Sequence, residues 1–122
     1  MDNGLSKEER ICSVKAVEAL IAGGRHVCCE PLRCCWYTRQ AQDINRIMIS
    51  VPKRLFKRAV KRNLLKRRIR EAYRLQKHQL ESRGIDMMFV YTSKEVADFQ
   101  TIFASMQTLL GIISNKTGDS SK

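Results

Sequence analysis

The hydrophobic pattern of this 122-residue chain predicts an α+β fold: a single two-layer α/β sandwich with helices packed on one side of a small mixed sheet. Strand-like segments follow a first helical segment, a long basic helix separates two strands, and the chain closes with a helical apolar stripe. The expected order is therefore α-β-β(-β)-α-β-α. Because 43% of the residues are hydrophobic, we expect one domain over residues 1–122, with an ordered core at about 5–114 and a flexible tail at 115–122.

The first elements are a short helix and one or two strands. Apolar residues recur at helical spacing from Ser13 to Ala22, with Ser13 as the N-cap and glycines at positions 23 and 24 ending the helix. Residues 32–38 are rich in strand-forming types and predict a strand. Since Pro31 interrupts the run before it, residues 25–29 form at most a short edge strand.

The middle of the chain predicts a strand, a break and a long helix. A polar turn is expected at 39–45, and the alternation from Arg46 to Val51 then predicts a second strand. Pro52 ends that strand because it cannot continue a sheet ladder. A helix follows from about Arg58 to Ser82, and Gly84 supplies its stop.

The last third predicts a buried strand and a final helix. Residues 85–91 are almost continuously apolar, as in a strand covered on both faces. After a loop at 92–97, Asp98 is the expected N-cap of the last helix. That helix carries one apolar stripe, formed by Phe99, Ile102, Phe103, Met106, Leu109, Leu110 and Ile113.

The charge of the chain is concentrated in one stretch. Residues 53–83 hold thirteen Lys or Arg and two acids, so their net charge is +11, the same as that of the whole chain. Read at 100° per residue, the helix has an apolar side formed by Leu65, Ile69 and Ala72, flanked by Leu64, Leu75 and Tyr73. The opposite side carries Asn63, Lys66, Arg67, Arg70, Arg74 and Lys77. Arg68 sits near the apolar edge, where its stem can pack.

Such a face predicts binding to a polyanion. A merely solvated helix usually alternates the sign of its charges, and a membrane-surface helix favours a Trp or Phe rim that is missing here. Arginine suits phosphate contacts and base stacking, so RNA is the favoured partner. A ribosomal or RNA-chaperone protein is the alternative, and DNA ranks third because helix-turn-helix spacing and dimerising heptads are lacking.

The helix also carries a specific pattern. The order R-N-x-x-K-R-x-x-R is formed by Arg62, Asn63, Lys66, Arg67 and Arg70, and it follows a strand end with the sequence Ser50-Val51-Pro52-Lys53-Arg54. Together with length, charge and element order, this pattern resembles the bacterial ribonuclease P protein subunit from about residue 5 to 114.

The resemblance implies a subunit of an endoribonuclease whose RNA binds the catalytic Mg²⁺ and removes the 5′ leader of precursor tRNA, without an organic cofactor. It also implies a left-handed strand-helix-strand crossover, against the usual rule. It places these residues on the catalytic RNA: Arg58, Arg62, Asn63, Lys66, Arg67, Arg70 and Arg74. A cleft for the leader would be lined by Val17, Ile21, Tyr37, Ser50, Lys53 and Arg54.

The first helix departs from the family pattern. The family commonly has two Phe residues four apart there, where this chain has Val17 and Ile21. A stacked base contributes about 1 to 3 kcal/mol, so leader contact is weaker here unless another ring replaces them. Trp36 and Tyr37 are the candidates, and only one of them can face the cleft because strand residues alternate.

The protein itself lacks a recognisable catalytic set. The two histidines, the scattered acids and the cysteines show no spacing of a nucleophile, a general base or a two-metal site. The five cysteines are interpreted as reduced, apolar strand residues, with a metal site of His26, Cys29 and Cys34 as the alternative. Without a signal peptide or a membrane span, we expect a cytoplasmic protein. The resemblance implies a monomer within a one-to-one ribonucleoprotein.

Overall fold

The computed structural model describes residues 10–11, 14–38, 44–80 and 84–119. Three α-helices and four strands occur in it, with a 3₁₀ turn at Lys77–Gln79 after the second helix. The bounds, in chain order, are α1 (Val14–Gly23), β1 (Arg25–Cys29), β2 (Leu32–Thr38), β3 (Arg46–Ser50), α2 (Ala59–Gln76), β4 (Ile85–Tyr91) and α3 (Phe99–Asp119). The element order and both early strands are confirmed.

The four strands form one mixed sheet in the order β1-β2-β4-β3. The pairs β1–β2 and β2–β4 are antiparallel, while β3 and β4 are parallel, with Ile47 opposite Met87. Arg10 adds an isolated parallel bridge to Ile47 at the outer edge of β3, through the N–H of Ile11, which donates to the carbonyl of Ile47 at 2.9 Å.

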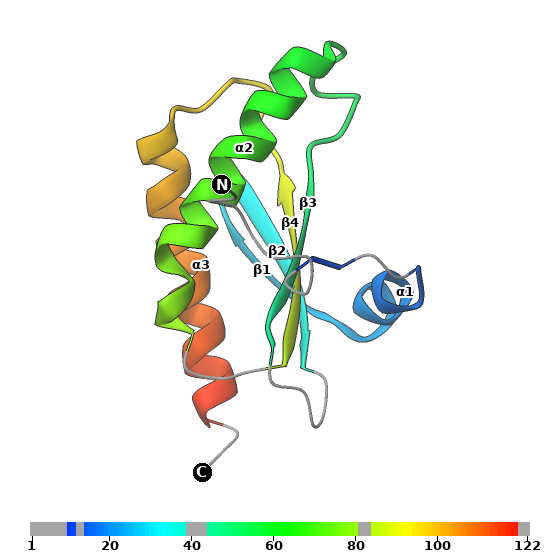
Figure 1. Ribbon diagram of the computed structural model, residues 1–122, viewed down its shortest axis with the longest axis vertical. Helices are drawn as coiled ribbons and strands as arrows, with labels where there is room; N and C mark the ends of the chain where they lie inside the picture. Colours follow the sequence, from blue (N-terminus) through cyan, green and yellow to red (C-terminus); the bar gives the residue numbers. More distant parts are fainter. Residues whose placement is uncertain (1–9, 12–13, 39–43, 81–83, 120–122) are drawn as a thin grey trace, which may run out of the picture.

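The helices lie on both faces of this sheet, so the prediction that all of them pack on one side is wrong for α1. Figure 1 shows α2 and α3 together on one face and α1 on the other. The alternation of β2 explains the difference. Cys34 and Trp36 point into the core under α2 and α3, whereas the Cys35 thiol points to α1 and donates to the carbonyl of Leu20 at 3.2 Å.

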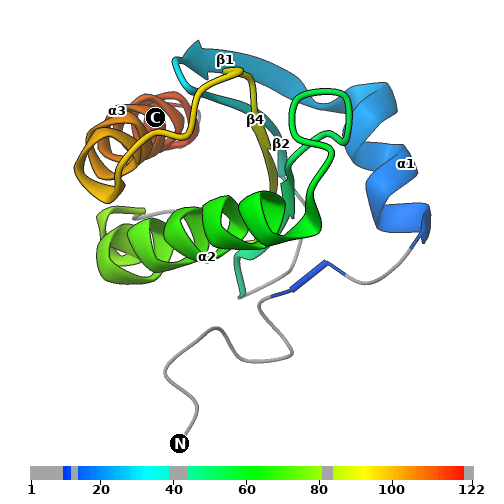
Figure 2. The ribbon, with the colours of Figure 1, turned by 90° about the horizontal axis from the view of Figure 1, so that it is seen from above.

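The path from β3 through α2 to β4 is a left-handed crossover, as the family resemblance implied. Seen from the side of α2 with both strands pointing up, β4 lies to the left of β3 (Figures 1 and 2). Most parallel connections have the opposite hand. The hand determines which sheet edge α2 approaches, and α2 runs closest to β3 rather than to β1.

The core fills the space between the sheet and the α2–α3 pair. Leu65, Ile69 and Ala72 of α2 are fully buried there, and the Tyr73 ring packs against Phe89 with 6.0 Å between ring centroids. The predicted apolar sides of α2 and α3 are therefore confirmed, except for Leu75, which is 43% exposed. Trp36 is a core residue.

Two helix ends differ from the prediction. The helix α2 ends at Gln76 instead of Ser82, because the Gln76 amide is buried and donates to the carbonyl of Phe103 at 3.0 Å. The chain then leaves the helix so that Leu80 enters the core, and Gly84, at φ 79°, turns it into β4.

The helix α3 continues to Asp119, although a flexible tail was expected from residue 115. Among the side chains that the structure describes, Ile113 is the last buried one of α3, and each residue that extends the helix can add one backbone hydrogen bond. Its predicted start is confirmed, since the Asp98 carboxylate accepts the N–H of Thr101 at 2.8 Å. The predicted N-cap Ser13 and most of the turn at 39–45 lie outside the described residues.

Candidate nucleic-acid interface

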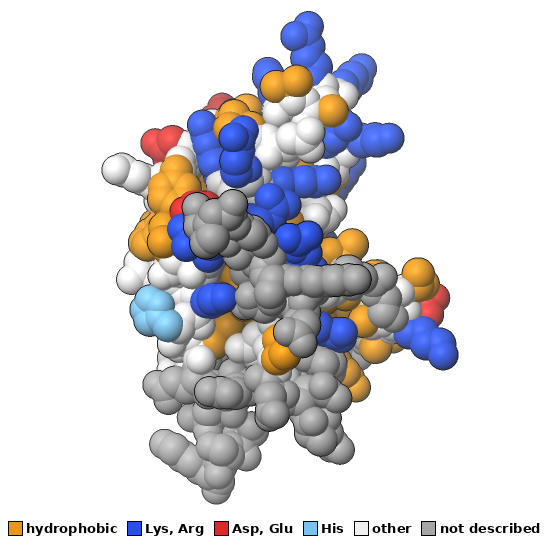
Figure 3. All heavy atoms as spheres, viewed as in Figure 1, with side chains coloured by type: hydrophobic (Ala, Val, Ile, Leu, Met, Phe, Trp, Pro, Cys, Tyr) orange, Lys and Arg blue, Asp and Glu red, His pale blue; other side chains and the backbone are white. Residues whose placement is uncertain are grey.

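The cationic side of α2 faces away from the core. Because Leu65 and Ile69 are fully buried, the helix has one rotational setting, and it turns Asn63 and Arg67 into solvent. Lys66 and Arg70 are half-buried along the border with β3. Figure 3 shows Lys and Arg side chains gathered over α2 and over the connector that precedes it, with few acids among them.

One predicted RNA contact is paired with an acid. Arg74 binds Glu71 through two hydrogen bonds, of 2.9 Å from Nε and 2.6 Å from Nη2. The hydrogen bond from Arg74 lowers the pKa of the Glu71 carboxyl below its ordinary value. The pair stands in solvent, where such bridges contribute little to stability, but it cancels one positive charge at this end of the face.

Two other arginines of α2 hold the helix to neighbouring loops. Arg62 Nη1 donates to the carbonyls of Phe56 at 2.7 Å and Lys57 at 2.8 Å, so it fastens the connector before the helix. Arg68 Nη1 donates to the carbonyl of Ala97 at 2.6 Å, in the loop before α3. The structural role of Arg62 was not foreseen, because its carbonyl partners can be identified only once the connector is folded.

The residues predicted for the leader cleft share the other face of the sheet. Tyr37 lies two positions after Cys35 on β2, and Ser50 is the partner of Val90 on β4. Because side chains alternate along a strand, Tyr37 points to the same side of the sheet as Cys35, and Ser50 to the same side as Val90. This is the side that carries α1. A Cβ at Gly23 would lie 3.4 Å from the Tyr37 ring, which places that ring at the end of α1. Tyr37 is therefore the ring on this surface, and Trp36 is not.

The remaining predicted cleft residues come from α1 and from the connector after β3, and they differ in exposure. On α1, Val17 is half-buried and Ile21 is 61% exposed. Lys53 and Arg54 follow β3 and are exposed in the connector. Tyr37 and α1 thus give this side of the sheet an apolar surface level with the start of β3, whereas the two cations lie beyond the end of β3.

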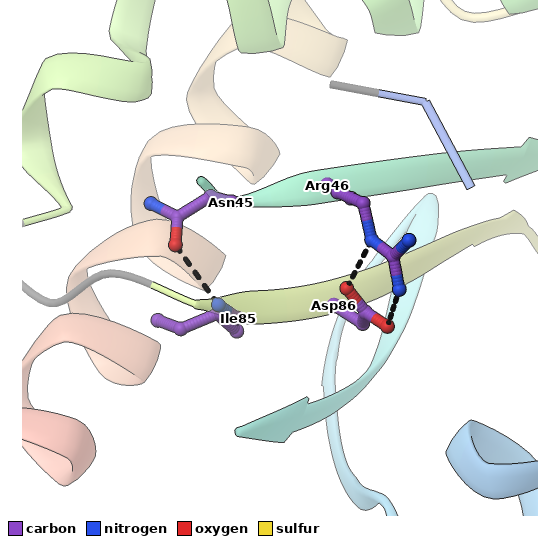
Figure 4. Close-up of polar contacts among 4 residues, drawn as sticks. All are labelled: Asn45, Arg46, Ile85 and Asp86. Carbon is purple, nitrogen blue, oxygen red and sulfur yellow. Dashed lines mark hydrogen bonds and ion pairs between the residues drawn. The ribbon is translucent and has the colours of Figure 1, made fainter. Parts of the chain in front are cut away.

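The sequence reasoning missed Arg46 and Asp86, which are neighbours of Tyr37 on the same face. Arg46 donates to the Asp86 carboxylate from Nε at 2.9 Å and from Nη2 at 2.7 Å (Figure 4). Asp86 is 2% exposed and Arg46 24%. Next to them, the Asn45 side-chain oxygen accepts the N–H of Ile85 at 3.0 Å. The available signal was the single acid within the apolar run of β4.

The alternative metal site is wrong. Cys29 and Cys34 point to the core face of the sheet, while His26 pairs with Cys35 on the opposite face, 3.9 Å from its sulfur. Within the ranges that the structure describes, His, Cys, Asp and Glu do not gather in a group of three that could hold a metal ion. Burial raises the pKa of the Cys34 thiol well above its ordinary value.

The described part of the chain contains no helix long and apolar enough to cross a membrane. The fold and the charged helix define a small basic α+β protein with a cationic helix suited to a polyanion. Comparisons with known proteins identify the family to which the chain belongs.

The model of the Ribonuclease P family matches residues 5–114, so the chain belongs to that family. It is 36% identical to the ribonuclease P protein component of Porphyromonas gingivalis over 92% of this chain and 88% of the relative. The corresponding protein of Borrelia hermsii is 29% identical, over 89% and 97% of the two chains. Proteins of this family are components of an endoribonuclease complex of tRNA processing.

Solved structures agree with this assignment. A mutant of the Staphylococcus aureus RNase P protein superposes with a TM-score of 0.77 at 25% identity, over 88% of this chain and 89% of that one. The RNase P protein from Thermotoga maritima superposes with a TM-score of 0.73 at 24% identity, over 85% and 96%. The α+β fold is therefore that of the RNase P proteins.

Proposed function

We propose that this chain is the protein subunit of ribonuclease P, and that it binds both the catalytic RNA and the 5′ leader of precursor tRNA. The RNA would hold the Mg²⁺ ions and cleave the phosphodiester bond, with one protein monomer per RNA in the cytoplasm. The observation that carries the proposal is the outward cationic side of α2 in a chain of this family.

The arrangement of charge supports the RNA contact. Along α2 the only acid is Glu71, so most of its cations have no acid on the same helix to neutralise them. Like charges at helical spacing repel one another by a few tenths of a kcal/mol per pair. Bound phosphates would remove this repulsion and release counterions from the RNA.

The two surfaces lie on different sides of the molecule, which supports simultaneous binding of two RNA segments. The face of α2 belongs to the layer that covers one side of the sheet, whereas Tyr37 and α1 lie on the other. A protein with this layout can hold a substrate strand against one surface while the other remains on the catalytic RNA.

Reconstitution tests the proposal. The full chain is added to the ribonuclease P RNA of Porphyromonas gingivalis at low magnesium concentration, and removal of the leader from precursor tRNA is measured. We expect the rate to increase on addition of the protein, and a preference for precursor over mature tRNA that grows with leader length. Equal rates with and without the protein would contradict the assignment.

The charged face is tested by substitution. Arg67→Ala removes an exposed cation of α2, and it should weaken binding to the RNA and reduce the slope of log K against log salt by about 1. Arg33→Ala, which removes an exposed arginine from β2, is the matched control for the RNA alone and should leave the slope unchanged. An unchanged slope for Arg67→Ala would mean that this side chain is only solvated.

A further inference from the structure

Two arginines of the described strands point to the side of the sheet that carries α1, and they differ in their partners. Arg46, at the start of β3, donates two hydrogen bonds to the buried Asp86 carboxylate. Arg33 lies on β2, two positions before Cys35, so its side chain points to the same side of the sheet. Arg33 is exposed, and it makes no hydrogen bond or ion pair with any residue that the structure describes.

The charge of Arg33 acts on this side of the sheet. Burial raises the pKa of the Cys35 thiol, and the positive charge of Arg33 opposes that increase. The acid nearest to Arg33 in the sequence, Glu30, lines a hollow together with Thr101 of α3, and α3 covers the opposite side of the sheet. Arg33 is therefore a cation that can accept an anionic partner from outside the protein.

Arg33 belongs to a row of side chains that crosses the sheet. It is the register partner of Val90 on β4, and Val90 is in turn the partner of Ser50 on β3. Because neighbouring strands lie about 4.8 Å apart, Arg33 and Ser50 stand about 10 Å apart across this row. Val90, between them, is apolar and only 8% exposed. Beyond Ser50 the chain continues to the exposed cations Lys53 and Arg54, so the row has positive charge at both ends.

We propose that Arg33 holds a phosphate of the 5′ leader, which crosses the sheet along this row from β3 to β2. Proteins that bind single strands combine cations that follow the backbone with surfaces against which the bases pack. The row provides both, and the planar fork of an arginine can bind a phosphate through two N–H groups. The inference rests on the proposed function. It adds to the predicted cleft a residue of β2 that the sequence pattern did not indicate.

The test uses the holoenzyme reconstituted from the full chain and the ribonuclease P RNA of Porphyromonas gingivalis. Arg33→Ala removes the cation, and Arg33→Lys keeps a positive charge at this position. Arg25→Ala is the matched control. Arg25 is also exposed on a strand, but it is the register partner of Trp36 and lies over that ring, 5.7 Å from its centroid, on the core side of the sheet. Affinity is measured at several salt concentrations for mature tRNA and for precursors with a series of leader lengths.

We expect Arg33→Ala to weaken binding of the precursor with the longest leader about 2- to 5-fold, as for the loss of one exposed ion pair. The slope of log K against log salt should fall by about 0.7, the value for one phosphate of a single strand. Arg33→Lys should keep the wild-type slope, and Arg25→Ala should behave as wild type. Binding of mature tRNA and of the catalytic RNA alone should be unchanged in all three variants.

Cys28 offers a second measurement that needs no substitution. It is exposed and is the register partner of Arg33 on β1, so it lies at the end of the row. Alkylation of Cys28 in the wild-type holoenzyme, followed by peptide mass spectrometry, should be slower with the long-leader precursor than with mature tRNA. Equal rates would refute this path of the leader, even if Arg33→Ala did not fold.

The outcomes separate the role of Arg33 from the function on which it rests. If the wild-type holoenzyme binds precursor no better than mature tRNA, the proposed leader binding itself fails. If it prefers the precursor and Arg33→Ala keeps both the affinity and the slope, the role of Arg33 is refuted and the function stands. An equal loss for mature tRNA would place the contact outside the leader, and an equal loss with Arg25→Ala would reflect overall charge. Each of these two results also refutes the proposal.

Discussion

The rotational setting of α2 can be tested with one substitution made at two places. Leu65→Ala and Leu75→Ala remove the same three carbon atoms from the same helix, ten residues apart. Leu65 is fully buried, whereas Leu75 is 43% exposed. Transfer of the lost groups costs about 0.8 kcal/mol per carbon, or about 2.4 kcal/mol at Leu65, and the cavity raises the loss to about 3 to 5 kcal/mol.

At Leu75, only the buried part of the side chain contributes to the loss of stability. The expected loss is therefore about 1.4 kcal/mol, because the substitution leaves no closed cavity. Urea unfolding followed by circular dichroism measures both free energies of unfolding. We expect Leu65→Ala to lose at least about 1.5 kcal/mol more than Leu75→Ala, with unchanged m-values. Equal losses would refute the observed rotation of the helix, and with it the assignment of its cationic side to solvent.

Further predictions concern turns, a cap and the cysteines. Gly24→Ala should destabilise the fold strongly, because its Cβ would lie 2.3 Å from the backbone oxygen of Leu20 in α1. Gly111→Ala should stabilise α3 by about 0.5 to 1 kcal/mol in the same urea unfolding assay, because outside the nearby backbone of its own helix the new Cβ would meet no atom within 4 Å. The hydrogen bonds from Thr101 lower the pKa of Asp98, so its contribution to stability is present above the pKa of the unfolded chain and is lost as the pH falls through the folded value. Asp98→Asn should therefore lose less stability than wild type on acidification, and equal acid profiles would contradict this role of the cap. Alkylation followed by peptide mass spectrometry should modify the exposed Cys28 in the folded protein and the buried Cys34 only after unfolding, since burial disfavours the Cys34 thiolate. Early labelling of Cys34 would show that the sheet opens at β2.

Much of the local structure is predictable from the sequence, because it follows from short-range periodicity. The alternation at 46–51, the helical stripe of α3 and the stop at Pro52 each depend on residues a few positions apart. The prediction was least accurate at the end of α2, because that end depends on the buried contact between Gln76 and Phe103, 27 positions apart.

In the candidate site, too, some features are predictable from the sequence and others depend on the folded chain. The cations of α2 follow from the helical period, and so does the pairing of Arg74 with Glu71, since those two residues are neighbours on a helix. The ion pair of Arg46 with Asp86 joins residues 40 positions apart, and the hydrogen bond from Arg68 to the Ala97 carbonyl joins residues 29 positions apart. Both therefore become visible only in the folded chain.

The sequence by itself determined that this protein has one long helix with an apolar and a cationic side, and that its pattern is similar to the ribonuclease P family. The tertiary structure decided that α1 lies on the opposite face of the sheet, that Tyr37 rather than Trp36 lies beside it, and that Arg33 stands in one row with Val90 and Ser50. The reason is physical. Periodicity specifies which side of an element is buried, whereas strand order and packing specify which distant residue it is buried against.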